Sequence, residues 1–180
     1  MRRPGIRTTV STAAAVLAAC ASTPKLTAPD VPPALRTPAG QTVFLEALAT
    51  GVQIYECAPK KEQADQYEWA FRAPEATLVD RGSKRLGRHY GGPTWESIDG
   101  SKVVGEVKGR DPGPDPAAIP WLLLAAKSTS GNGVFTPTAS IQRVRTTGGI
   151  APAQPCGAEN VGRMARVPYT ASYYFYRAAQ

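Results

Sequence analysis

The sequence predicts an all-β fold, a single domain built as an antiparallel β-sandwich or β-barrel. Many short segments alternate apolar and polar residues with a period of two, which is the pattern of half-buried strands. Gly and Pro each occur 17 times in 180 residues, and this content favours turns over long helices. The roughly 140 residues that follow any leader are enough for one hydrophobic core and too few for two. These observations leave the choice between a sandwich and a barrel open.

The first predicted strands lie near the start of this domain. Residues 41–48 and 52–57 alternate, and the residues 49–51 between them, Ala-Thr-Gly, indicate the turn of a hairpin. A strand over residues 67–72 has an aromatic face and a polar face, so we expect the aromatic face, Tyr67, Trp69 and Phe71, in the core. Further short strands are predicted over residues 76–79 and 84–90.

The later elements follow the same pattern, with one exception. Asp99-Gly100 predicts a two-residue hairpin turn with positive φ at both positions, flanked by strands. Three prolines make residues 110–118 a loop. The run near 119–127 is apolar on all sides, so a short helix after Pro120 and a buried strand both fit. Strands are predicted again over residues 138–146 and 166–176.

The N-terminus has the pattern of an export signal. Three arginines, Arg2, Arg3 and Arg7, precede a charge-free run, and Leu17-Ala18-Ala19-Cys20 resembles the lipobox of bacterial lipoproteins. We therefore expect residues 1–19 to be a lipoprotein signal peptide and Cys20 to carry the lipid, such as palmitate. The alternative is an ordinary secretory leader that is cut after Ala19. Residues 20–39, rich in proline, are expected to form a tether, and residues 40–180 the single β-rich domain.

This signal predicts the compartment and the partners. The protein should cross the inner membrane and stay anchored by its lipid in the cell envelope, on the periplasmic side at the outer membrane. The formal net charge of +7 falls to +4 once the three leader arginines are removed, and no dense Lys/Arg cluster remains. We expect no nucleic-acid partner; the expected partners are the membrane and a small ligand or an envelope protein.

The cysteine and histidine counts limit the chemistry. With Cys20 acylated, Cys57 and Cys156 are left in an oxidising compartment and are expected to form one disulfide. The alternative is a reactive thiol, although neither cysteine lies in a CxxC motif or beside His89. One His and three Cys argue against a Cys/His zinc site, and no cofactor is expected.

Several local strings occur together along the chain: GVQIY at 51–55, APEA at 73–76, HYGGPTWE at 89–96, DGS at 99–101, IPWLL at 119–123, IQR at 141–143 and the Tyr-rich tail at 169–176. Together they resemble a family of secreted bacterial and fungal proteins known only as a domain of unknown function, over roughly residues 35–177. The resemblance implies no activity, substrate or cofactor. Some fungal members carry a malate dehydrogenase label, but this chain has no GxGxxG after a strand and no βαβ pattern.

The strongest candidate for a ligand site surrounds the only histidine. His89, a Gly-Gly-Pro turn and a Trp-Glu pair fall within eight residues, and aromatic walls with a few polar groups are typical of ligand pockets. Arg143, on the same predicted strand face as Arg145, suggests a paired charge or an anion site. The candidate ligand-binding residues are His89, Tyr90, Trp95, Glu96, Trp121 and Arg143.

Two functions fit these residues. The first is a binding module for a small molecule, a glycan or a protein partner. The second is a hydrolase or isomerase in which His89 works with Glu96 or Asp99 as acid and base. Ser97 and Ser101 lack a GxSxG elbow, and His89 with Glu96 and Asp99 makes an incomplete zinc set. The composition favours the binding module and a structural His89.

Overall fold

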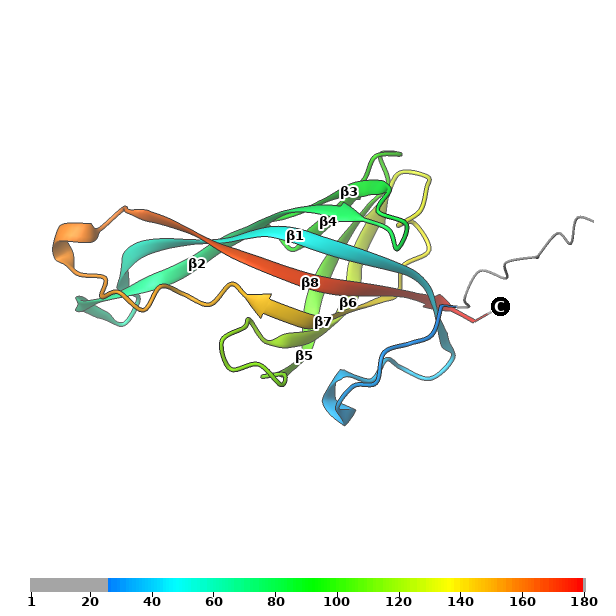
Figure 1. Ribbon diagram of the computed structural model, residues 1–180, viewed down its shortest axis with the longest axis horizontal. Coiled ribbons are helices and arrows are strands. Elements are labelled where there is room, and N and C mark those ends of the chain that lie inside the picture. Colours follow the sequence, from blue (N-terminus) through cyan, green and yellow to red (C-terminus); the bar gives the residue numbers. More distant parts are fainter. Residues whose placement is uncertain (1–25, 180) are drawn as a thin grey trace, which may run out of the picture.

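The computed structural model describes residues 26–179 and shows a closed antiparallel barrel of eight strands. Each strand pairs with its neighbour in the chain, and β8 closes the barrel on β1 (Figure 1). The all-β prediction is confirmed, and the open choice is decided in favour of a barrel. The strands are β1 (Gln41–Lys60), β2 (Gln63–Val79), β3 (Arg85–Tyr90), β4 (Thr94–Ser97), β5 (Lys102–Asp111), β6 (Trp121–Ser130), β7 (Ser140–Gly148) and β8 (Met164–Ala178).

Helical structure in residues 26–179 is limited to two short 3-10 turns, η1 (Pro33–Leu35) and η2 (Ala158–Asn160). No helix among these residues has the length and apolar character that a membrane span requires. The ambiguous run after Pro120 is the strand β6. Its side chains are apolar on both sides because Leu122 and Leu124 face the barrel core while Trp121 packs against a second cluster outside it.

The hairpin predicted around Gly51 is wrong, because β1 runs through this glycine without a turn. β1 pairs with β2 on one side and with β8 on the other, and Gly51 lies opposite Ala76 and Tyr169. A Cβ atom on Gly51 would lie 2.1 Å from the carbonyl oxygen of Glu75. The glycine therefore allows a close approach of two strands rather than a reversal of the chain.

The hairpin at Asp99-Gly100 is present, but its turn differs from the predicted two-residue type. Ser97 N–H donates to the Ser101 carbonyl at 2.9 Å, and Gly100 N–H donates to the Ser97 carbonyl at 3.0 Å. Gly100 has φ +85°, whereas Asp99 is not among the residues with positive φ. This is a three-residue loop in which a turn is followed by one left-handed glycine.

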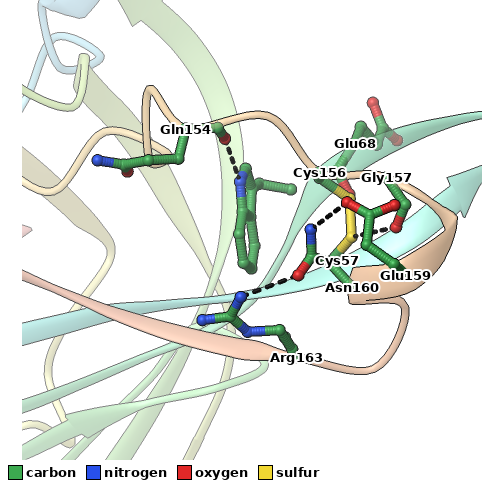
Figure 2. The surroundings of a disulfide bond; sticks show 9 residues. Cys57, Glu68, Gln154, Cys156, Gly157, Glu159, Asn160 and Arg163 are labelled. Atoms are coloured by element: carbon green, nitrogen blue, oxygen red, sulfur yellow. Dashed lines mark hydrogen bonds between the residues drawn. A yellow bond between two sulfur atoms is a disulfide. The ribbon is translucent and has the colours of Figure 1, made fainter.

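Strands β1, β2 and β8 are longer than the others and extend beyond the barrel as an arm (Figure 1). Tyr67, Trp69 and Phe71 lie on the β2 part of this arm, and Phe71 is 52% exposed, so the prediction that they form part of the core is wrong. The chain between β7 and β8 packs on the arm instead, and Trp69 Nε1 donates to the Gln154 carbonyl at 2.9 Å (Figure 2). The aromatic face lies beyond the closed part of the barrel.

The predicted disulfide is confirmed between Cys57 in β1 and Cys156 in the β7–β8 connection (Figure 2). Cys57 is fully buried, and its N–H donates to the Arg163 carbonyl at 2.9 Å. The bond therefore fastens the long connection before β8 to the arm.

Residues 26–36 lie against the outer wall of the barrel. Leu35 is fully buried, and Gln142 Nε2 donates to its carbonyl at 2.6 Å. Leu26 and Val31 pack on an outer cluster made of Val144, Tyr174 and Tyr176, together with Trp121. The described part of the expected tether thus covers apolar side chains on the barrel wall, while the predicted signal peptide and Cys20 lie outside the described residues.

Candidate functional site

A cavity of about 360 Å³ opens into the barrel interior at one rim. In an up-and-down barrel, the odd-numbered strands end at the same rim at which the even-numbered strands begin. We call this the open rim; it carries the β3–β4 turn at 91–93 and the β5–β6 loop at 112–120. The residues that line the cavity are Gln53, Tyr55, Phe71, Arg72, Pro74, His89, Gly92, Pro93, Trp95, Val107, Arg110, Ile119, Pro120, Leu122, Leu124, Arg143 and Tyr173.

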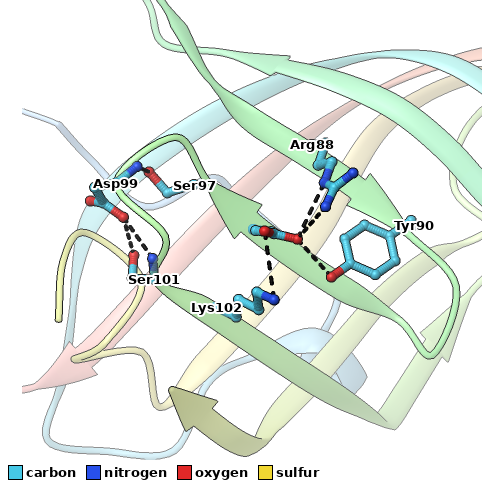
Figure 3. Close-up of polar contacts among 7 residues, drawn as sticks. Arg88, Tyr90, Ser97, Asp99, Ser101 and Lys102 are labelled. Atoms are coloured by element: carbon cyan, nitrogen blue, oxygen red, sulfur yellow. Dashed lines mark hydrogen bonds and ion pairs between the residues drawn. The ribbon is translucent and has the colours of Figure 1, made fainter. Parts of the chain in front are cut away.

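The opposite rim is closed by the loop between β6 and β7. Phe135 is fully buried, and its ring centroid lies 4.8 Å from that of Phe175. Asp99 holds this loop, because its carboxylate accepts from the Val134 N–H at 2.9 Å and from the Ser101 hydroxyl at 2.6 Å. The hydrogen bond from Ser101, followed by that from Val134, lowers the pKa of Asp99 to about 2. Asp99 and Ser101 therefore stabilise this rim, which we call the closed rim (Figure 3).

His89 projects from β3 into the barrel and is buried against two aromatic rings. Its ring stacks on Trp95 with centroids 4.4 Å apart and meets Tyr173 edge-on at 5.1 Å. Nδ1 lies 2.9 Å from the Thr94 carbonyl oxygen, which can only accept, so Nδ1 carries the proton. Burial lowers the pKa of His89 to about 3, and the positive charge of Arg143 acts in the same direction. At neutral pH the imidazole is uncharged, and its Nε2 is an acceptor.

Arg143 enters the cavity from β7. In the register it lies between Leu122 of β6 and Tyr173 of β8, and all three line the cavity. Its Nε and Nη2 atoms both donate to the Pro120 carbonyl, at 3.1 and 2.7 Å. Throughout residues 26–179, no carboxylate oxygen lies within 4.0 Å of this guanidinium group. The cavity thus contains a positive charge that is held by the Pro120 carbonyl and lies next to the Tyr173 hydroxyl, with no carboxylate of the described residues beside it.

Several buried donors around the cavity have no hydrogen-bond partner in the described part of the chain. They are Gln53 Nε2, Trp95 Nε1 and the hydroxyl groups of Tyr169 and Tyr173; the two hydroxyls lie near each other, and that of Tyr173 lies near Arg143, without a hydrogen bond of ordinary length and angle. Buried polar groups are normally hydrogen-bonded, so four such atoms in one region of the molecule are unusual. Burial raises the pKa of both tyrosines, which are therefore neutral donors.

Three of the six residues predicted from the sequence to bind a ligand line the cavity together: His89, Trp95 and Arg143. The other three, Tyr90, Glu96 and Trp121, lie on the outer face of the barrel. Glu96 faces outward and bonds to the Arg88 guanidinium and the Tyr90 hydroxyl, each at 2.8 Å (Figure 3). The hydrogen bond from Tyr90 is the main reason that the pKa of Glu96 is lowered. Successive residues of a strand point to opposite faces, so Trp95 and Glu96 cannot share one site.

Trp121 is outside the cavity for the same reason, since its neighbour Leu122 faces inward. Arg145, expected on the same face as Arg143, is turned outward by an irregularity in β7 at which its φ is +51°. Its guanidinium donates to the Tyr174 hydroxyl at 2.7 Å and lies 3.5 Å from Glu46.

The acid–base pairs considered from the sequence are not assembled. His89 lies inside the barrel, Glu96 outside it, and Asp99 at the closed rim. Ser101 is fully buried and bonded to Asp99 and to the Phe135 N–H, away from the cavity lining. In residues 26–179 no three His, Cys, Asp or Glu side chains are grouped to hold a metal ion.

The sequence analysis missed Gln53, Tyr55 and Tyr173 as cavity residues. Tyr173 shares the inward face of β8 with Ala171 and Phe175, so the alternation along this strand is the signal that could have found it. The alternation gives the face of a residue but not its height in the barrel. That height depends on the register between strands, so only the fold brings Gln53 and Tyr173 to one cavity.

Comparison with known proteins gives one match. A family model described as "Protein of unknown function (DUF3455)" matches residues 38–177, so the resemblance to a domain of unknown function is confirmed. No match was found among curated proteins or among solved structures.

Proposed function

Because the chain belongs to the family described as Protein of unknown function (DUF3455), whose description names no activity, we propose its function from the barrel itself: it is a binding protein that holds one small, largely apolar molecule at the open rim. The cavity of about 360 Å³ carries this proposal. Small-molecule sites are concave, mostly apolar and of roughly 300–1,000 Å³. A closed barrel supports such a site because its wall is held by hydrogen bonds that the ligand need not supply.

The side chains that line the cavity suit a ligand that is mostly apolar. Leu122, Leu124 and Ile119 form aliphatic wall, and Trp95 and Tyr173 form aromatic wall. At the mouth Phe71 is 52% exposed and Val107 is 45% exposed. Large apolar side chains exposed at the edge of a cavity are typical of ligand-binding grooves.

The acid–base alternative has less support. A base needs to lie within hydrogen-bond reach of its proton and to have a pKa near the working pH. The pKa of His89 is about 3, and its contacts are two aromatic rings and a carbonyl group. These features favour a structural and wall-forming role for His89.

We also propose that the barrel works as a lipid-anchored protein of the cell envelope. The support is the lipobox-like string that ends at Cys20 and the basic, then apolar, leader before it. A disulfide is consistent with an oxidising compartment such as the periplasm.

The binding function can be tested with a neutral aromatic probe, naphthylmethanol, and a variant that narrows the mouth. Tryptophan fluorescence of the full chain should change saturably with the probe, because Trp95 is part of the wall. Val107→Trp should weaken binding about tenfold, since overpacking by ~1–3 kcal/mol corresponds to roughly that factor. Val161→Trp is the matched control, because Val161 is also exposed, at 50%, but does not line the cavity.

Equal probe affinity in Val107→Trp and the unmodified chain would overturn the assignment of binding to this cavity. Weaker binding in the Val161→Trp control as well would show a general effect of added tryptophan, and would count against the assignment equally.

A further inference from the structure

Arg143 has unused hydrogen-bonding capacity inside the barrel. A guanidinium group carries five N–H bonds, and the two contacts to the Pro120 carbonyl come from Nε and Nη2. No Asp or Glu belongs to the cavity lining. A buried or partly buried charge is normally paired, so this arrangement calls for an anionic partner.

The side chains next to Arg143 add donors. Tyr173 lies directly opposite Arg143 in the β7–β8 register and is 1% exposed, and its hydroxyl forms no hydrogen bond of ordinary length and angle, although Tyr169 and Arg143 lie nearby. Gln53 is 2% exposed and lines the same cavity, and its Nε2 has no partner either. The Tyr55 hydroxyl differs, because it already donates to the Gly149 carbonyl at 2.6 Å.

Gln53 also belongs to a tightly packed group at the open rim. A Cβ atom on Gly149 would lie 3.0 Å from Gln53 Cγ, 2.9 Å from Tyr169 Cβ and 3.0 Å from Ile119 Cγ2. Ile119 N–H in turn donates to the Gly148 carbonyl at 2.8 Å. The aliphatic part of the Gln53 side chain is therefore closely packed, and its amide nitrogen is a buried donor without a partner. We call Gln53, Arg143 and Tyr173 the polar corner.

We propose that the polar corner binds a carboxylate group, so that the ligand is an organic acid with an apolar body. The inference rests on the proposed binding function and names its ligand class. A carboxylate is planar and accepts two parallel N–H bonds from a guanidinium group, and its remaining lone pairs suit the Tyr173 hydroxyl and the Gln53 amide. The apolar body then lies along Trp95, Leu122 and Leu124.

The side chains at the mouth of the cavity also favour a negatively charged ligand. Arg72 and Arg110 both contribute to the lining, and neither is accompanied there by an acidic side chain. Arg72 is engaged by Glu56 at 2.8 Å, whereas Arg110 is exposed and forms no ion pair with any carboxylate of residues 26–179. A cavity bordered by positive charge raises the local concentration of anions.

The test compares naphthoate with naphthylmethanol, which share a ring system and differ in the carboxylate, by calorimetric titration of the full chain. Naphthoate should bind about ten- to a hundredfold more tightly, the range expected for a charge-assisted hydrogen bond. Arg143→Met should remove this preference, so that naphthoate and naphthylmethanol bind the variant with similar affinity. Arg143→Lys should restore part of it, because lysine keeps the charge but loses the planar fork.

A second variant separates ligand binding from folding. Tyr173→Phe should weaken naphthoate about five- to tenfold relative to naphthylmethanol, since it removes one buried donor that faces the carboxylate site. Tyr174→Phe is the matched control on the outer face of the same strand, where the hydroxyl accepts from Arg145. Naphthoate affinity should not change in this control.

The possible outcomes distinguish the two proposals. Equal affinities for naphthoate and naphthylmethanol, both reduced by Val107→Trp, would overturn the carboxylate site and leave the binding function standing. A preference for naphthoate that survives in Arg143→Met would also overturn the carboxylate site. Binding of neither molecule would overturn both proposals, and tight competition by inorganic phosphate would replace the carboxylate by a phosphate group.

Discussion

His89 shows how the barrel interior changes a single residue. The imidazole lies between Trp95 and Tyr173, and its one polar contact is the Thr94 carbonyl. Burial lowers its pKa to about 3, so the native state binds its proton far less readily than the unfolded chain. The same burial makes the residue a neutral part of the wall.

We predict a loss of stability at mildly acidic pH that depends on His89. The pKa in the unfolded state is about 6.5, above the folded value, so the unfolded chain takes up the proton first as the pH falls. The contribution is fully present above about pH 6.5 and is lost progressively toward pH 3. The free energy of unfolding should fall by up to about 1.4 kcal/mol per pH unit more than in His89→Gln. Denaturant titrations between about pH 7 and pH 5 measure this, and parallel curves for the two proteins would contradict it.

Tyr173 and Tyr176 should respond differently to the same chemical change. Tyr173→Phe removes a buried hydroxyl that forms no hydrogen bond of ordinary length and angle, although Tyr169 and Arg143 lie nearby, so the free energy of unfolding should stay within about 0.5 kcal/mol or rise. Tyr176→Phe removes a hydroxyl that donates to Gln142 Oε1 and should cost about 1 kcal/mol. Urea denaturation of the two variants provides the comparison; a larger loss for Tyr173→Phe would show that its hydroxyl has a partner in the folded state.

At the scale of elements, β1 is the strand on which the barrel closes. It pairs with β2 and with β8, and it carries Gly51, Gln53, Tyr55 and Cys57 in one uninterrupted run. The interior face of β1 thus contributes to the cavity, and its end forms the arm with the disulfide.

We predict that Gly51→Ala destabilises the barrel, although alanine usually suits a strand better than glycine. The added Cβ would meet the Glu75 carbonyl oxygen at 2.1 Å and Ala76 Cα at 2.5 Å. The cost should be about 2–3 kcal/mol in the free energy of unfolding. Gly82→Ala is the control, since its Cβ would lie 3.3 Å from a side-chain oxygen of Asp80. Similar thermal stability of the two variants would refute the close-approach explanation.

The Cys57–Cys156 disulfide should stabilise the fold by closing a long loop. The two residues are 99 positions apart, and bonds that close loops of this length are worth about 2–5 kcal/mol. Replacing both by Ser should lower the free energy of unfolding by that amount. Limited proteolysis should then cut the β7–β8 connection first, because the bond fastens this segment to the arm. Unchanged stability of the double variant would show that the bond adds nothing to the fold.

At the scale of the whole molecule, the two rims of the barrel differ. One is closed by Phe135 and the Asp99 hydrogen bonds, and the other opens into the cavity. β1 begins and β8 ends at the closed rim, so the cavity opens at the rim opposite these strand ends. A chain anchored through its N-terminus can therefore leave the cavity accessible.

The lipid anchor gives a prediction for the whole protein. When the full chain is produced in bacteria supplied with labelled palmitate, the label should be incorporated and the protein should partition with membranes. Cys20→Ala should abolish the label and release the protein. A wild-type chain recovered unlabelled in the soluble fraction would refute the anchor.

Local pattern alone predicted much of the fold and part of the candidate site. Alternation predicted the strand over residues 166–176, which is part of β8, and cysteine counting assigned the Cys57–Cys156 bond. Neither depends on how strands are ordered around the barrel, since side-chain period and the absence of competing thiols are properties of the chain itself.

Only the tertiary structure decided which inward residues meet. The register of β7 against β8 sets Arg143 opposite Tyr173, and the irregularity after Val144 turns Arg145 outward. The continuity of β1 through Gly51 depends on how closely β2 approaches it. These features arise from pairing between segments far apart in the sequence, and a pattern with a period of two gives the face of a residue but not its position along the barrel.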